Sequence, residues 1–194
     1  YKREPRNATH AIQLAKALDK EAFLEIRIPD RASDAFTSEE QAVRLLDQVV
    51  VQQPDNGGFN EQRANFLQHL ALIGKKQRRN KSDVAEIERR EFSGLRSALL
   101  SSPSKSSPLW ANVYALTYSQ RAGDAVDLAY TVTLLTPESA TAQVAYIFAL
   151  EASNSDAEAT ARLPSVLDRA SEAELQTLWT IFGAHGNTSA SDRI

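Results

Sequence analysis

The sequence predicts an all-α protein made of antiparallel helical hairpins. Apolar residues recur at steps of three and four along most of the chain, which places them on one face of each successive helix. Short turns that contain proline, glycine or a capping serine separate these stretches, and such residues are typical of helix ends. No pair of stretches shows the alternation expected of neighbouring β-strands. A hairpin of two one-sided helices cannot bury its apolar faces alone, so the hairpins are expected to stack on one another.

The first half of the chain is expected to form four helices. Apolar stripes and capping residues place them at residues 8–23, 38–53, 60–79 and 82–100. Residues 27–36 are predicted to form a loop, because Pro29 interrupts a short β-prone stretch. Ser38 begins the second helix with the Ser-Glu-Glu-Gln pattern of a capping box, and Pro54 marks its end.

The second half is expected to form five shorter helices. The same signals place them at residues 108–121, 124–135, 139–153, 157–170 and 171–183. Pro108 is tolerated in a first helical turn, where its missing N–H has no partner, whereas Pro164 is expected to break the helix that contains it. Residues 187–194 are predicted to be a disordered tail, so a single domain is expected over residues 1–186.

One segment carries a repeat signal. Pro103 follows the helix expected at residues 82–100, and Pro137 follows the one expected at 124–135. Their separation, 137 − 103 = 34 residues, is the period of a tetratricopeptide repeat. Small residues stand at the offsets used by the second helix of that family, namely Ala125, Ala129 and Val132. Residues 106–139 therefore resemble one tetratricopeptide unit, and weaker copies of the spacing precede Pro54 and Pro103. The resemblance implies a short right-handed solenoid of stacked hairpins.

Composition narrows the classes of function. A formal net charge of −3 argues against a general nucleic-acid binder. The absence of cysteine excludes disulfides and zinc–thiolate sites. No apolar run reaches the roughly 18 residues that a membrane span requires. Methionine is absent even at position 1, so we expect the chain to begin inside a larger gene product. The basic opening YKREPRN fits the flank of a removed anchor or signal as well as the start of an excised fragment.

The sequence shows no reaction chemistry, and we predict neither an enzyme nor a cofactor. The histidines His10, His69 and His185 lie far apart in the chain without a metal-ligand spacing, so they are interpreted as surface or helix-end residues and no metal site is predicted. Acidic pairs such as Glu39-Glu40 are interpreted as helix-capping and solubilising residues. There is no glycine-rich phosphate loop and no nucleophile elbow.

Two surfaces are candidates for binding a partner. The first is an aromatic groove on the central helices, made of Trp110, Tyr114, Tyr118, Gln143 and Tyr146. The second is a basic run that would suit an anionic partner, made of Lys75, Lys76, Arg78, Arg79 and Lys81. The alternatives are that the aromatic residues are core and that the basic run is a solvated helix end. Of the two surfaces, the sequence favours the groove, because the clearest repeat lies there.

The predicted function is a non-catalytic scaffold or adaptor that docks a protein or peptide. The degenerate, alanine-rich repeats are similar in style to bacterial extracytoplasmic tetratricopeptide-like domains, including those of exopolysaccharide assembly systems. That similarity implies a periplasmic or membrane-anchored location, reached through a removed N-terminal segment, with the cytoplasm as the alternative. The second hypothesis is an oligomerisation domain of a larger membrane-linked machine, which would associate with copies of itself.

Overall fold

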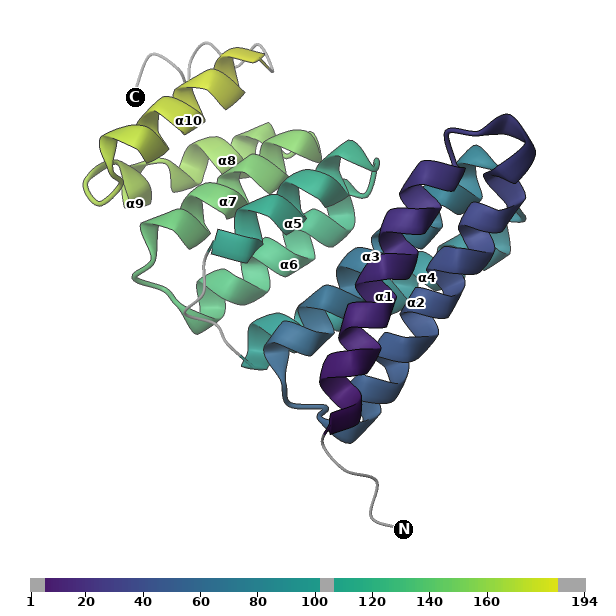
Figure 1. The fold of residues 1–194 in the computed structure, drawn as a ribbon. Helices are drawn as coiled ribbons and strands as arrows, with labels where there is room; N and C mark the ends of the chain where they lie inside the picture. Colours follow the sequence, from purple (N-terminus) through teal and green to yellow (C-terminus); the bar gives the residue numbers. More distant parts are fainter. Residues whose placement is uncertain (1–5, 102–106, 185–194) are drawn as a thin grey trace. The chain divides into compact units, whose positions relative to one another are not determined.

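The computed structural model describes residues 6–101 and 107–184, and every regular element in these ranges is helical (Figure 1). The predicted all-α class is therefore confirmed. The chain divides into two compact units, Tyr1–Ser101 and Ser102–Ile194, where the sequence led us to expect one domain over residues 1–186. The tail predicted at residues 187–194 lies outside the described residues. Within the described ranges, no helix combines the length and the hydropathy that crossing a membrane requires.

The first unit is a row of long helices joined by short turns. Its elements are α1 (Arg6–Glu25), the 3-10 turn η1 (Pro29–Arg31), α2 (Ala32–Gln52), α3 (Gly57–Lys76) and α4 (Lys81–Ser101). The most extensive contacts join neighbours in the chain, α1 with α2, α2 with α3 and α3 with α4. Consecutive helices run in opposite directions, as expected for hairpins (Figure 1).

The core of this unit combines small and large residues. Alanines with no exposed surface lie on α1 and α2, while leucines fill the space toward α3. The fully buried members include Ala15, Ala22, Ala35, Ala42, Leu46 and Leu67. Small side chains let helix axes approach closely, so the first two helices can pack tightly along their length.

Helix α2 begins earlier than the sequence indicated. Residues 32–36 are helical, although they belong to the stretch predicted as a loop. Ser38 lies inside the helix and does not cap it; its hydroxyl donates to the buried Glu25 carboxylate over 2.9 Å. The extra turn buries Phe36, and the guanidinium of Arg79 stacks on its ring at 3.5 Å. This tertiary packing outweighs the local preference of the Pro29 segment for a loop.

The second unit is built around one central helix. Its elements are α5 (Ser107–Tyr118), α6 (Ala122–Leu135), α7 (Ala140–Ala152), α8 (Asp156–Arg162), α9 (Pro164–Leu167) and α10 (Glu172–Ala184). Helix α7 packs against all the others, and residues 144–151 are buried without interruption. Its N-terminus is capped by Ser139, whose hydroxyl accepts from the Ala142 N–H at 3.3 Å. The predicted break is confirmed, because Pro164 opens a separate short helix.

We predict that Ala129→Leu destabilises the second unit. Ala129 on α6 has no exposed surface, so a larger side chain must displace its neighbours. Overpacking of this kind costs about 1–3 kcal/mol in the free energy of unfolding, and thermal melting would measure it. Asp127→Leu adds a leucine at an exposed position of the same helix and is the control. An unchanged melting temperature for Ala129→Leu would contradict the packing described.

Candidate functional site

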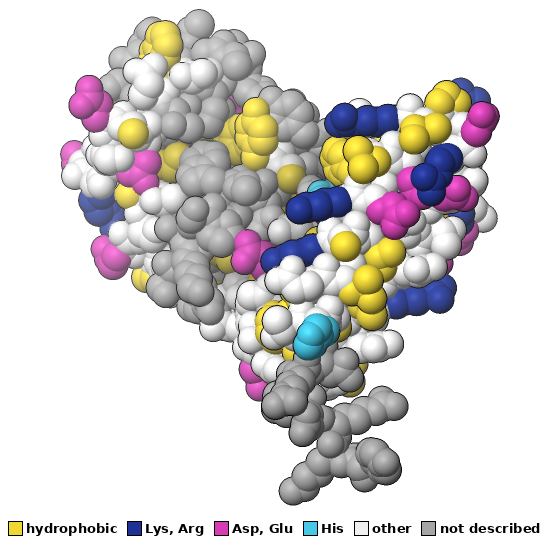
Figure 2. Space-filling view, in the orientation of Figure 1, with side chains coloured by type: hydrophobic (Ala, Val, Ile, Leu, Met, Phe, Trp, Pro, Cys, Tyr) yellow, Lys and Arg dark blue, Asp and Glu magenta, His cyan; other side chains and the backbone are white. Residues whose placement is uncertain are grey.

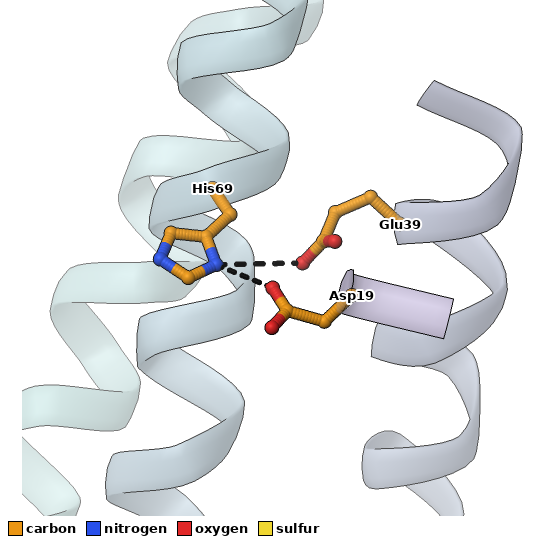
Figure 3. Close-up of side chains that lie close together, drawn as sticks. All are labelled: Asp19, Glu39 and His69. Atoms are coloured by element: carbon orange, nitrogen blue, oxygen red, sulfur yellow. Dashed lines mark hydrogen bonds and ion pairs between the residues drawn. The ribbon is translucent and has the colours of Figure 1, made fainter. Parts of the chain in front are cut away.

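Three polar side chains from three different helices meet inside the first unit (Figure 3). Asp19 comes from α1, Glu39 from α2 and His69 from α3. His69 Nδ1 lies 2.6 Å from Asp19 Oδ1 and 4.0 Å from Glu39 Oε1. One ligand-type atom from each residue lies within 4.8 Å of the other two, and the described part of the chain holds one group of this kind. We call these three residues the acid–histidine cluster.

The helical spacing of the sequence directs the two acids inward. Asp19 stands four residues after one buried alanine and three before another, on the face of α1 that packs against α2. Glu39 has the same relation to buried alanines on α2. Polar residues thus replace core residues in two apolar stripes. That interruption was the available signal in the sequence, but it does not reveal that the two positions face each other.

Glu39 is the unusual member of the cluster. The residue has no exposed surface, and neither carboxyl oxygen has a hydrogen-bond partner among the described residues. Burial raises the pKa of Glu39 to about 8; the charge of Asp19 raises it as well, and the charge of His69 acts in the opposite direction. This corrects the interpretation of Glu39 as a capping residue, because it lies in the third turn of α2 and points into the core (Figure 3).

His69 is held firmly within the cluster. The hydrogen bond with Asp19 raises the pKa of its imidazole, while burial lowers it and the charges of both acids raise it further. The ring meets Phe23 edge-on at 5.8 Å and stacks on Phe66 at 6.3 Å between centroids. His69 is therefore a half-buried residue of the α1–α3 contact, where the sequence had suggested a surface residue.

The chemistry open to this cluster is limited to proton sharing and cation binding. An imidazole oriented by a carboxylate can act as a general base when it also bonds a nucleophile. None of the hydrogen bonds of His69 within the described ranges reaches a hydroxyl side chain. One nitrogen and two carboxylates can instead act as ligands of a divalent metal ion.

The basic run forms a second feature, at the turn between α3 and α4. A cavity of about 490 Å³ is lined there by Lys75, Arg78, Arg79, Lys81, Val84 and Glu88. We call it the basic pocket. Lys75 pairs with Glu88 at 2.6 Å, and Lys76, outside the lining, donates to the Ile26 carbonyl at 3.3 Å. Within the described residues, the exposed Arg78 and Lys81 make no side-chain ion pair or hydrogen bond, so both cations can meet a ligand.

The residues predicted to form the aromatic groove differ in exposure. Tyr114 is 50% exposed and stacks on Phe148 at 5.9 Å, and Gln143 is half-buried. Tyr146 is 5% exposed; its hydroxyl donates to Glu158 at 3.0 Å. This corrects the expectation that Tyr146 faces a partner, since its ring belongs to the core around α7. The side chains of Trp110 and Tyr118 lie outside the described residues.

Comparison with known proteins does not assign the chain. No protein-family model matches the sequence, and no curated protein matches it either.

We predict that Glu39→Gln stabilises the metal-free protein increasingly as pH rises. The pKa of Glu39 is about 8 in the fold, against an ordinary value of 4.5. The protonated Glu39 carboxyl therefore contributes fully to the free energy of unfolding below about pH 4.5. This contribution is lost as pH rises through 8, because the buried acid must then ionise. Glutamine keeps the shape without ionising, so the gap between variant and wild type should reach a few kcal/mol near pH 9, on the order implied by a shift of this size.

Thermal melting at pH 5, 7 and 9 in the presence of a chelator measures that gap. Glu40→Gln changes a half-exposed carboxylate paired with Arg44 at 3.0 Å, and it should follow the wild type at each pH. If the melting temperatures of Glu39→Gln and wild type changed in parallel with pH, the prediction would be wrong.

Proposed function

We propose that the chain is a non-catalytic helical scaffold, tetratricopeptide-like in its stacking, that docks a protein or peptide partner. The arrangement of the first unit supports this, because α3 packs against α2 and also reaches α1, where His69 bonds Asp19 at 2.6 Å. A third helix that touches both members of the preceding hairpin is what the stacking of hairpins requires. In the second unit α7 has the same relation to α5 and α6.

The observation that carries a binding role is the basic pocket. Its lining combines four cations with one carboxylate, and an apolar wall of Val84 lies among them. Arginine and lysine side chains around an apolar wall suit an acidic peptide segment, since guanidinium groups bind carboxylates through two parallel hydrogen bonds. We therefore place the partner at this pocket in preference to the aromatic groove, where Tyr146 is buried.

The proposal also includes a cellular location for the scaffold. The similarity in style to bacterial extracytoplasmic repeat proteins supports a role in the envelope, for example in exopolysaccharide assembly, with a cytoplasmic adaptor as the alternative. A specific nucleic-acid partner is not proposed, because the net charge is −3 and the basic pocket occupies a single turn.

Self-association is the second candidate, and exposed apolar side chains favour it. Leu134, Leu135 and Tyr130 on α6 are 64%, 43% and 43% exposed. On the face that carries α1, by contrast, apolar side chains are interspersed with cations (Figure 2). A clustered apolar surface is more typical of a protein interface than scattered single residues are.

We predict that Arg78→Ala/Lys81→Ala weakens binding of an acidic peptide. The probe is a fluorescein-labelled decapeptide of glutamate, measured by fluorescence anisotropy at low and high salt. Loss of the two unpaired cations should weaken binding at least tenfold, about 1.4 kcal/mol. Binding by the wild type should also weaken with salt, because exposed charges are screened beyond about 10 Å at 0.1 M ionic strength.

The matched control is Arg89→Ala/Arg96→Ala, which removes the same charge from exposed positions of α4 outside the pocket. It should bind the peptide as the wild type does. An equal loss of peptide affinity in both double variants would show that only net charge matters, and it would refute the basic pocket as the binding site. An oligogalacturonate is the second probe. Tighter binding of this probe than of the peptide would indicate an anionic polysaccharide as the partner.

We predict that the wild type is monomeric. The self-association hypothesis predicts instead a dimer that Leu134→Glu/Leu135→Glu dissociates. A charged pair on the exposed apolar surface of α6 cannot be buried in an interface without a large desolvation cost. Light scattering after size exclusion measures the mass of both proteins. A wild-type dimer that becomes monomeric in the variant would favour the oligomerisation hypothesis over the monomeric scaffold.

A further inference from the structure

We propose that Asp19, Glu39 and His69 form a binding site for a divalent first-row transition-metal ion of the zinc and cobalt class. The three side chains converge from α1, α2 and α3 with their ligand-type atoms within 4.8 Å of one another (Figure 3). The site shares no residue with the basic pocket. The two proposals therefore stand or fall separately.

The donor set selects the class of ion. One imidazole nitrogen with two carboxylates suits zinc, cobalt, iron or manganese, whereas magnesium and calcium prefer oxygen ligands alone. Cysteine and methionine are absent from the whole sequence, so no soft sulfur ligand is available to favour copper(I). The two carboxylates balance the charge of a divalent ion when both are ionised.

Glu39 is the independent observation that points to a ligand. Its side chain is 1% exposed, its oxygens lack hydrogen-bond partners among the described residues, and Oε1 faces His69 Nδ1 at 4.0 Å. A buried polar group in a folded protein normally has a partner, so an unpartnered carboxyl calls for an explanation. A metal ion bound between the three side chains supplies the missing partner and neutralises the ionised acid.

The present distances fit such an ion after small side-chain movements. Bonds of about 2.0–2.2 Å to the metal place neighbouring ligand atoms roughly 3.0–3.5 Å apart. The separations of His69 Nδ1 from Asp19 and Glu39, 2.6 and 4.0 Å, lie on either side of that range. Binding requires Asp19 to withdraw slightly and Glu39 to advance. The proton of the Glu39 carboxyl and the proton between His69 and Asp19 are both released to solvent.

The surroundings define an open side and a closed side. Phe23 and Phe66 confine the imidazole ring. His69 and Asp19 are 30% and 19% exposed, while Glu39 lies at the bottom of the cluster. An ion would therefore enter past Asp19 and His69, keep water or an external ligand on that side, and cross-link three helices. Sequence spacing could not show this site, because its ligands lie 20 and 30 residues apart, at positions 19, 39 and 69.

The test is a titration of the tag-free, chelator-treated protein with zinc by calorimetry and with cobalt by visible absorption. We expect one ion per chain, appearance of cobalt d–d bands, a rise in melting temperature and no response to magnesium at the same concentration. Glu39→Gln and His69→Gln should each weaken binding at least tenfold, since loss of even an outer partner of a metal ligand costs roughly 10- to 100-fold.

Matched controls separate this site from adventitious binding at the surface. Glu40→Gln and His10→Gln alter a half-exposed carboxylate and an exposed histidine of the same helices, α2 and α1, and should bind within twofold of the wild type. Circular dichroism checks that each variant is folded. For the wild type, cobalt should shift and broaden the imidazole NMR signals of His69 more than those of His10. This measurement uses the wild type alone and so does not depend on whether a variant folds.

The proposal is overturned by several results. Absence of binding up to about 1 mM zinc or cobalt would be one. Unchanged affinity in both ligand variants would be another, because the ion would then lie elsewhere. Broadening centred on His10 would also refute it. None of these outcomes bears on binding of the acidic peptide at the basic pocket.

Discussion

The close approach of α1 and α2 is the constraint on which the first unit depends. Alanines without exposed surface lie at matching intervals on both helices, at 15 and 22 on one and at 35 and 42 on the other. Small residues permit this approach, and the two acids lie between them on the same helix faces. Asp19 and Glu39 consequently face α3 from the interior, and His69 is the residue that meets them (Figure 3).

Two other inward-facing acids of this unit, Glu25 and Asp47, have cations beside them. The Glu25 carboxylate accepts from Ser38 and pairs with Arg31 at 2.5 Å. Asp47 is bracketed by Arg63 at 2.5 Å and Arg90 at 2.8 Å, so it ties α2 to both α3 and α4. These pairs follow the rule that a buried charge needs an opposite charge and hydrogen bonds. Glu39 differs from them, because its carboxyl oxygens have no hydrogen-bond partner among the described residues, and this is the observation behind the proposed metal site.

The basic pocket rests on the same core. Gly74 of α3 allows a close contact, since a Cβ there would lie 3.3 Å from Val84 and 3.4 Å from Phe36. Phe36 in turn supports the guanidinium of Arg79 at the pocket wall. The early start of α2 therefore helps to position one cation of the pocket. A partner bound at the turn would contact a surface that depends on the packing of α2, α3 and α4.

The sequence by itself determined the helical class, most helix ends and the break at Pro164, because these depend on local periodicity, capping and proline geometry. It also located the basic run that lines the pocket. Tertiary structure decided the early start of α2, the burial of Tyr146 and the division into two units, since each depends on contacts between distant residues. It alone brought Asp19, Glu39 and His69 together. Their helical phases were readable from the sequence, but which faces meet across three helices is set by the packing of the whole core.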